Sequence, residues 1–384
     1  MKGAKRLLAP ITLGVGISLV GCGGTQTTDM SGFNSAGSRY GDNSNVSTAT
    51  SYGAATLGSK FLPLSGGKYS FVAGINLPTL TGQALAEFDK KPVYSSKSIS
   101  GSLEDIATTG ANVVRVALFH NLYGLKFDSN GLTTGLEDGF LKDLSDLLDK
   151  AEANKMQVYV TVLDQWNDSA TAKSPLTNVQ ARDAFFKKVL APITSNLKGR
   201  TSVMALDMFS EIEKQVAGKE GNGTDKGLSW DQARSFLKSE LDAIKAVDPA
   251  RLVTASSGLH NWENIRDGRF SKLNLDFYDF HIYDDKGTLP PAKDLKTDRT
   301  ILIGACGPTS KSTDVEAQTK TYQGFLSSAS QQGYAGVLIG EYDKNPKSVL
   351  SLLDKDGKHK PALTEFQTFV AALQTSSAAT KVGK

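Results

Sequence analysis

The sequence is poor in cysteine and histidine. Its two cysteines are Cys22 and Cys306, and two thiols cannot build a disulfide framework or a cysteine-based metal site. The four histidines are not paired at metal-ligand spacing; they are His120, His260, His281 and His359. We therefore expect neither a disulfide-rich scaffold nor a metal cofactor.

An excess of charge of one sign is also missing. The chain has 43 Lys and Arg against 40 Asp and Glu, a net charge of +3. Three of the basic residues precede Cys22, so a chain that began at Cys22 would carry 40 of each sign. There is no basic surplus to attract nucleic acid or anionic lipid.

A long hydrophobic run is absent. The apolar stretch from Leu7 to Val20 is shorter than the roughly 20 residues of a spanning helix, and Lys2, Lys5 and Arg6 precede it. This is the pattern of an exported precursor. The following "LVGC" resembles a bacterial lipobox, which implies cleavage before Cys22 and acylation of its thiol; an ordinary signal peptide is the alternative. Gly rather than Asp at position 23 favours the outer membrane in a Gram-negative cell, and otherwise the cell surface.

Composition divides the rest of the chain. We expect a signal peptide over 1–21 and a lipidated Cys22 opening a disordered tether over 22–66. The tether is rich in Gly, Ser, Thr and Asn and has too little apolar surface to offset the entropy of folding. One folded domain is predicted over 67–375, followed by a disordered tail over 376–384.

Eight apolar runs in the folded domain predict strands. They are "YSFVAGIN" from Tyr69, "ANVVRVALF" from Ala111, "MQVYVTVL" from Met156, "SVMALDMF" from Ser202, "RLVTASS" from Arg251, "LDFYDFHIY" from Leu275, "TILIGAC" from Thr300 and "AGVLIGEY" from Ala335. Helical patterns lie between most of them, for example over 136–154, 178–197, 230–246 and 314–332, and "SLED" at Ser102 resembles a capping box. Buried strands that alternate with helices predict a parallel α/β fold, here a (β/α)8 TIM barrel. A doubly wound open sheet is the alternative, although no GxGxxG follows the first run.

In such a barrel the functional groups lie where the strands end. The strand ends carry carboxylate, amide, cationic and aromatic side chains: Asn76, Arg115, His120, Asp164, Trp166, Glu211, Ser257, Trp262, His281, Tyr283, Glu341 and Tyr342. Aromatic faces and hydrogen-bonding groups of this kind suit sugars. Trp166 and Trp262 fit either a sugar platform or ordinary packing.

The order of these motifs resembles glycoside hydrolase family 5, the cellulase and mannanase group of retaining glycosidases. "GANVVRVAL" is similar to the family's second strand with Arg115, "ALDMFSEIEK" to its fourth and "DFHIY" to its sixth, with His281 and Tyr283. The resemblance implies an acid/base role for Glu211. It also exposes three departures. Ser210 replaces the usual Asn, Ile339-Gly340 replaces a Trp, and Ala305 in "ILIGACG" stands where the family has its nucleophilic glutamate.

Ala305 changes the expected chemistry. A retaining glycosidase needs two carboxyl groups, and an alanine methyl group cannot attack the sugar. Without an ionised neighbour, Glu211 should also be more fully ionised near neutral pH, the wrong state for an acid. Cys306, next along the strand, should point toward the helices as an inert thiol.

Three hypotheses follow. The first is a membrane-anchored lipoprotein that binds a β-linked polysaccharide or oligosaccharide, with hydrolysis weak or lost. The second is an active hydrolase whose second carboxylate is Glu341 or Asp164. The third is a structural or partner-binding surface lipoprotein. The family resemblance implies β-linked glucan or mannan as the ligand and no cofactor.

Overall fold

The computed structural model describes residues 62–64, 68–81, 93–166, 172–219, 221–258, 260–309 and 314–382. All belong to the unit Ser51–Lys384. The expected signal peptide, Cys22 and most of the tether lie outside the described residues. One correction concerns the end of the tether, because β1 (Leu62–Leu64) pairs antiparallel with β2 (Lys68–Ser70). Among the described residues, no helix is both long and apolar enough to cross a membrane.

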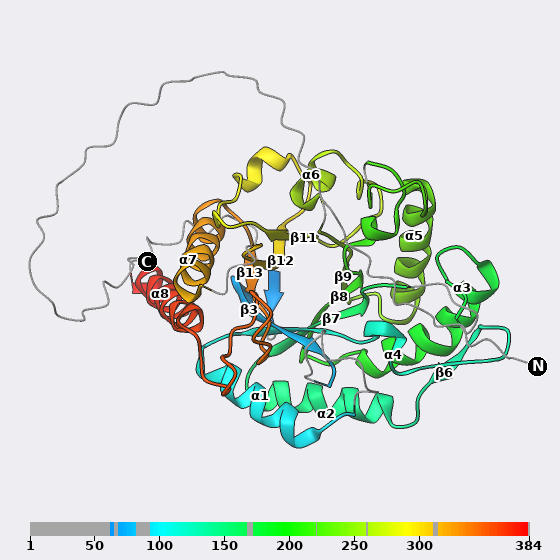
Figure 1. Ribbon diagram of the computed structural model, residues 1–384, viewed down its shortest axis with the longest axis horizontal. Helices are drawn as coiled ribbons and strands as arrows, with labels where there is room; N and C mark the ends of the chain where they lie inside the picture. The colour runs from blue at the N-terminus through cyan, green and yellow to red at the C-terminus, as the bar shows by residue number, and fades with distance from the viewer. Residues whose placement is uncertain are drawn as a thin grey trace, which may run out of the picture. The chain divides into compact units, whose positions relative to one another are not determined.

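The centre of the fold is a ring of parallel strands, seen end-on in Figure 1. The order around the ring is β10-β11-β12-β13-β3-β4-β7-β8-β9. The bounds are β3 (Val72–Thr79), β4 (Val113–Ala117), β7 (Gln157–Leu163), β8 (Val203–Phe209), β9 (Leu252–Thr254), β10 (Ser256–Ser257), β11 (Tyr278–Tyr283), β12 (Ile301–Gly307) and β13 (Gly336–Ile339). β9 and β10 form one run broken at Ala255, and they pair with β8 and β11 respectively, which closes the ring. The predicted (β/α)8 barrel and its eight strands are confirmed.

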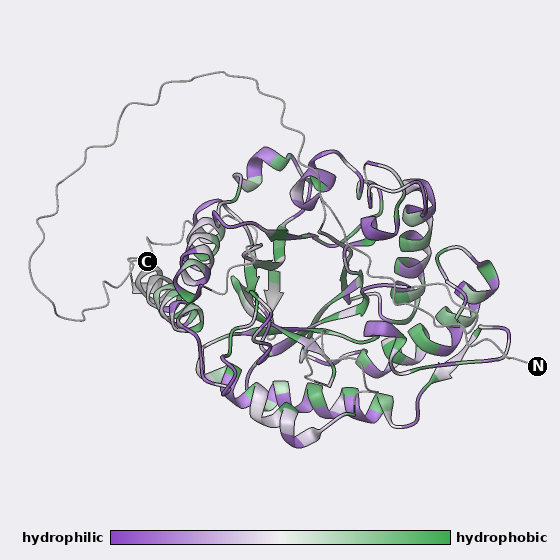
Figure 2. Cartoon of the chain, in the orientation of Figure 1, coloured by the Kyte–Doolittle hydropathy of each residue, from purple (hydrophilic) through white to green (hydrophobic). Residues whose placement is uncertain are grey.

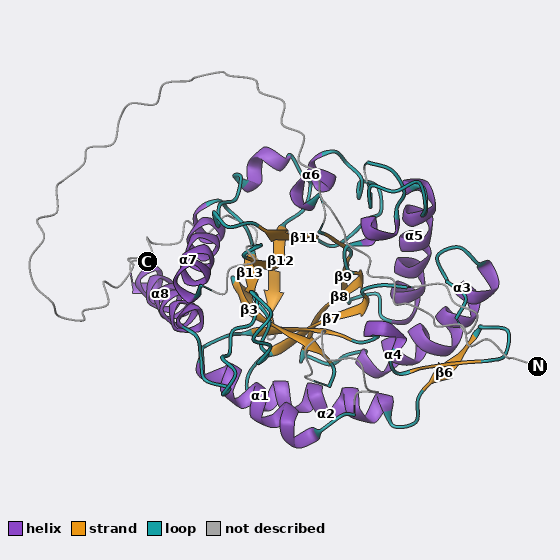
Figure 3. Cartoon of the chain, viewed as in Figure 1, coloured by secondary structure: helices purple, strands orange, loops and turns teal. Residues whose placement is uncertain are grey.

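Helices surround the strands, as Figure 3 shows in purple around orange. Their bounds are α1 (Ser96–Thr108), α2 (Phe140–Ala153), α3 (Val179–Phe185), α4 (Ala191–Leu197), α5 (Trp230–Val247), α6 (Asn261–Arg266), α7 (Val315–Gln331) and α8 (Pro361–Val382). A π-helical turn, Phe186–Leu190, joins α3 to α4, and a hairpin of β5 (Leu125–Phe127) and β6 (Thr133–Leu136) precedes α2.

Three helix boundaries differ from the sequence predictions. Leu136 ends β6, so the helix expected from 136 begins at Phe140. Ser102 lies inside α1, whose cap is Ser95: its side chain accepts a hydrogen bond from the Ser98 backbone N–H. α8 runs to Val382, into the range predicted to be a disordered tail.

Two apolar cores hold the barrel together. The larger lies between strands and helices, where the apolar helix faces turn inward (Figure 2). The smaller joins side chains of different strands, such as Val72, Tyr159 and Leu302, which belong to the inside of the ring because successive strand residues face opposite sides. Because side chains fill both cores, the open region of the barrel lies at the carboxyl ends of the strands.

Candidate active site

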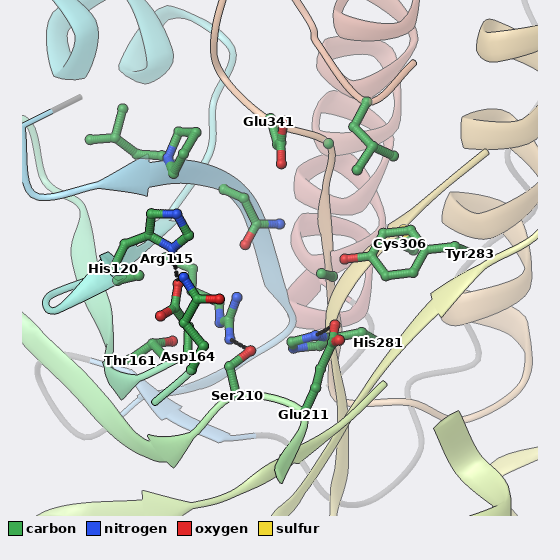
Figure 4. Close-up of a pocket in the computed structure, with 18 of the residues that line it drawn as sticks. Arg115, His120, Thr161, Asp164, Ser210, Glu211, His281, Tyr283, Cys306 and Glu341 are labelled. Atoms are coloured by element: carbon green, nitrogen blue, oxygen red, sulfur yellow. Dashed lines mark hydrogen bonds and ion pairs between the residues drawn. The ribbon is translucent and has the colours of Figure 1, made fainter. Parts of the chain in front are cut away.

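A cavity of about 340 Å³ lies at the carboxyl ends of the strands (Figure 4). Ten of the residues singled out in the sequence line it: Asn76, Arg115, His120, Asp164, Ser210, Glu211, His281, Tyr283, Ala305 and Glu341. They come from strands that lie far apart in sequence and meet only because the ring closes. The barrel therefore gathers the predicted groups into one site.

Glu211 lies two residues after the end of β8 and sits in the left-handed region of backbone conformation, with φ 54°. Its Oε1 lies 2.7 Å from Nδ1 of His281, and its Oε2 is ion-paired with Lys214, one helical turn further on. Burial alone would raise the pKa of Glu211, but the hydrogen bond and charge of His281 and the charge of Lys214 outweigh it and lower the pKa. Both carboxylate oxygens thus face donors that favour the ionised form.

Arg115 occupies the floor of the cavity. Its Nη2 donates to Oδ2 of Asp207 at 2.8 Å and to Oγ of Ser210 at 3.0 Å. Burial would lower the pKa of Arg115, but Asp207, Tyr159 and Asp279 raise it, so the guanidinium stays charged. Ser210 therefore reaches the site as a hydroxyl oriented by Arg115.

Two buried aspartates support this floor from inside the barrel. Asp207 accepts hydrogen bonds from Arg115 and from the backbone N–H of Ser256, and Asp279 accepts from the Tyr159 hydroxyl and the Gly304 backbone. Burial raises the pKa of Asp279 to about 6. Oxygen atoms of Asp207 and Asp279 and a ring nitrogen of His281 lie within 4.8 Å of one another. Because protein donors already engage both carboxylates, this arrangement fits a hydrogen-bond network better than a metal site.

Glu341 follows β13 and lies across the cavity from Glu211 in Figure 4. Burial and the nearby Asp343 raise the pKa of Glu341 to about 7. Ser348 Oγ lies 3.3 Å from its Oε2. The environment of Glu211 thus lowers the pKa of its carboxyl group, whereas the environment of Glu341 raises the pKa of its own. Asp164 is instead hydrogen-bonded to Nδ1 of His120 at the wall.

Ala305 is 6% exposed and lines the cavity between His281 and the strand β13. It pairs with His281 across β11 and β12, just after a register shift that leaves Gly304 as the extra residue. A Cβ atom on residue 304 would collide with the Asp279 carboxylate, so residue 304 must be glycine. The position that the sequence marked as a missing nucleophile therefore lies in the site and offers only a methyl group.

Cys306 belongs to the core between strands and helices, and its side chain donates to the Leu338 carbonyl at 3.5 Å. It also lines the base of the cavity, which the alternation of the strand alone did not predict. Burial raises the pKa of its thiol, so Cys306 stays a neutral thiol rather than a reactive thiolate.

Four predicted site residues do not line the cavity, which corrects the sequence-based list. Trp166 is 3% exposed and packs edge-on against Phe127 and Phe185. Trp262 lies outside the cavity lining, with the guanidinium of Arg266 over its ring.

Tyr342 is the third. Its hydroxyl donates to Asp105, on the outer helix α1, and His359 binds the same carboxylate at 2.6 Å. Ser257 is likewise buried, and donates to Glu213 at 2.8 Å. Proximity to a strand end was not enough to place these side chains in the site.

Some residues in and below the cavity were not predicted from the sequence. Lys214, three positions after Glu211, was detectable from the spacing in "SEIEK" because i and i+3 side chains meet on a helical turn. Asp207 and Asp279 interrupt apolar strands, an anomaly that marks a buried polar network. Leu350 lines the cavity from the loop after β13, and no sequence signal indicated it.

Comparisons with known proteins agree with this architecture. The profile of the cellulase family, glycosyl hydrolase family 5, matches residues 75–378. A mannan endo-1,4-β-mannosidase from Mytilus edulis is 23% identical over 309 residues, covering 67% of this chain and 83% of that protein.

Solved structures with the same fold include two mannanases. A β-1,4-D-mannanase from Cryptopygus antarcticus superposes with a TM-score of 0.65 at 18% identity, covering 81% of this chain and 95% of the other. An endo-1,4-β-mannanase from Eisenia fetida gives 0.62 at 19% identity, with 80% and 95% covered.

Proposed function

The chain belongs to the cellulase family of glycosyl hydrolases, family 5, and from this premise we propose that it binds β-1,4-linked mannan with hydrolysis of the β-linkage weak or lost. The observation that carries the proposal is that Ala305 lines the cavity, since the motif resemblance implies that this residue stands where the family has its nucleophile. A retaining enzyme attacks the anomeric carbon with a carboxylate about 5–5.5 Å from its acid. A methyl group forms no such bond.

The state of Glu211 supports the same conclusion. An acid must carry a proton to give to the leaving oxygen, whereas Lys214 and His281 favour the ionised form of Glu211. An ionised carboxylate still accepts hydrogen bonds from sugar hydroxyls. Glu211 therefore suits binding better than β-bond cleavage.

Binding is supported by what remains in the cavity. Asn76, Arg115 and Ser210 line the cavity, and so does Tyr283, whose hydroxyl is directed into the site in Figure 4. Tyr283 is 37% exposed and presents an aromatic edge to a ligand. Mannan is the favoured polymer because the compared relatives are named mannanases.

A second candidate is hydrolysis with a relocated carboxylate. Glu341 lines the cavity, and so does Asp164, which His120 already binds. A separation of about 6.5–9.5 Å from Glu211 would suit an inverting reaction. No feature of the cavity specifically favours the third candidate, a partner-binding surface protein.

The proposal extends to the location of the protein. We infer from "LVGC" that Cys22 carries a lipid that anchors the chain to a membrane, with the barrel beyond a tether. Metabolic labelling with a palmitate analogue tests this inference. Label is expected on the wild type and lost in Cys22→Ala, and label retained by Cys22→Ala would refute it.

The functional test uses purified full-length protein and three polymers: β-mannan, β-glucan and xylan. Binding is measured by calorimetry with the matching hexasaccharides, and cleavage by new reducing ends. Binding of mannohexaose without cleavage is the expected result. Cleavage lost in both Glu211→Gln and Glu341→Gln would favour the second candidate. Failure to bind any of the sugars would overturn the proposal.

A further inference from the structure

One side of the cavity is closed by an apolar side chain. Leu350 lies in the loop between β13 and α8, and it lines the cavity. A Cβ atom built on Gly307 would stand 2.5 Å from Cδ2 of Leu350, and one built on Gly340 would stand 2.7 Å from its carbonyl oxygen. Gly307 ends β12 and Gly340 follows β13. The loop therefore rests directly on the carboxyl ends of these two strands.

Hydrogen bonds hold Leu350 in this place. Its carbonyl oxygen accepts from the backbone N–H of Glu341 at 3.0 Å and from the hydroxyl of Tyr322 at 3.2 Å. The side-chain amide of Gln318 donates to the carbonyls of the residues before and after Leu350, at 2.6 Å and 3.0 Å. Tyr322 and Gln318 both lie on α7 and are buried. Leu350 is therefore a fixed wall of the cavity.

The opposite side of the cavity is polar and reaches solvent. In the order of the ring, β12 and β13 lie across from β7 and β8. Gln165 after β7 and Lys214 after β8 line the cavity there, and the Lys214 side chain is 50% exposed. Gln165 hydrogen-bonds Asn121 at an exposed position. Figure 4 likewise shows Asp164 across the cavity from Cys306. Among the described residues, an apolar wall thus faces a polar, partly exposed rim.

The cavity is also short. Its volume of about 340 Å³ is near the lower end of the range for ligand pockets, about 300–1,000 Å³. A cavity of this size holds the end of a sugar chain rather than a long internal segment. The rest of the chain must then leave on a side that no wall closes, and the rim at Gln165 and Lys214 is such a side.

Glu211 gives the direction of the chain. The family resemblance implies an acid/base role for Glu211, which places this residue beside the oxygen that links C1 to the leaving group. The leaving group is the part of the chain on the reducing side, so this part lies toward Glu211 and Lys214. In a 1,4-linked chain the bond toward the non-reducing end is made by O4, across the ring from C1. That bond would point toward Leu350.

We propose that the cavity takes the non-reducing end of a β-1,4-linked mannan chain, and that Leu350 sets this specificity by blocking O4 of the terminal ring. The terminal ring lies against Ala305, and the following rings leave past Lys214. Leu350 excludes longer occupants by steric clash rather than by a lost attraction. This inference rests on the proposed function, because the mannan ligand comes from there, and it adds which part of the polymer is recognised.

The experiment compares three forms of mannohexaose by calorimetry on full-length protein. One is unmodified, one is reduced to the alditol at its reducing end, and one carries a benzylidene acetal across O4 and O6 of its non-reducing ring. Wild type is expected to bind the first two alike and the benzylidene form at least about tenfold more weakly, since the acetal would meet Leu350. Leu350→Ala should reduce this ratio of affinities to less than about threefold, because it opens the wall.

Leu141→Ala is the matched control. Leu141 is a partly buried leucine on α2 that does not line the cavity, and its variant should keep the wild-type ratio. The inference is wrong if wild type binds the benzylidene and unmodified forms alike, if reduction weakens binding instead, or if Leu350→Ala keeps the wild-type ratio. In each of these cases mannohexaose still binds, so the proposed function stands. Failure to bind any of the three forms would refute the proposed function and this inference together.

Discussion

Arg115 and Asp207 form an ion pair of 2.8 Å inside the barrel, with the Asp207 side chain fully buried and that of Arg115 12% exposed. Arg115 lies on β4 and Asp207 on β8, so the pair spans β7 between them. It also fixes Ser210, which shares the same guanidinium nitrogen. Arg115, Asp207 and Ser210 therefore form one hydrogen-bonded, charged network at the floor of the site.

Arg115→Met should destabilise the protein by about 3–5 kcal/mol, because it leaves Asp207 as a buried charge without its cation. The measurement is urea unfolding followed by circular dichroism. The double variant Arg115→Met with Asp207→Asn should recover part of this loss, since the uncompensated charge is then gone. A double variant as unstable as the sum of two single variants would contradict the pairing.

The barrel was predictable because its signal is repeated. A single apolar run is weak evidence for a fold, but eight such runs that alternate with helical patterns are compatible with few folds. The site was predictable to the extent that strand ends converge, and Arg115, Glu211 and Glu341 all line the cavity. Rotamers are not encoded in strand order, and for this reason Trp166 and Tyr342 were assigned to the cavity although they pack elsewhere.

Lys214→Met should raise the pKa of Glu211. The ion pair with Lys214 and the interaction with His281 oppose the effect of burial, and removing the lysine leaves burial less opposed. The carboxyl carbon of Glu211, followed by NMR during an acid titration, reports the change. Lys238→Met is the control, because Lys238 pairs with Asp242 on the outer helix α5. An unchanged Glu211 titration would show that the lysine does not set its charge.

Ala305→Glu alone should give little β-mannan hydrolysis, and Ala305→Glu with Lys214→Met should give clearly more. The first change supplies a carboxylate where a nucleophile is needed, and its charge raises the pKa of Glu211. The second removes the cation that keeps Glu211 ionised. New reducing ends from β-mannan measure the gain. Ala305→Gln with Lys214→Met is the matched control, and equal activity in the two double variants would argue against a missing nucleophile.

Trp166→Ala should cost about 3–5 kcal/mol of stability, as expected for an aromatic side chain removed from a packed core. Trp262→Ala should cost less, because that ring is only partly buried and Arg266 covers it. Neither change should weaken mannohexaose binding, since neither side chain lines the cavity. Urea unfolding and calorimetry measure the two effects. A loss of binding in Trp262→Ala at unchanged stability would restore its predicted role as a sugar platform.

Glu341 should make the stability of the protein fall as the pH rises from about 4.5 to 7. Its pKa is about 7 in the folded chain against an ordinary value of 4.5, so within this window the folded state holds a proton that the unfolded chain has released. The contribution is present below pH 4.5 and is lost by pH 7, and it amounts to at most about 3 kcal/mol.

Glu341→Gln removes this group but not Asp279, whose pKa of about 6 gives a slope of the same sign. The variant should therefore show a shallower decline than the wild type rather than none. Urea unfolding at half-unit pH steps measures both curves. Glu316→Gln, an exposed residue on α7, is the control and should follow the wild-type curve. Parallel curves for the wild type and Glu341→Gln would show that Glu341 is already ionised in this window.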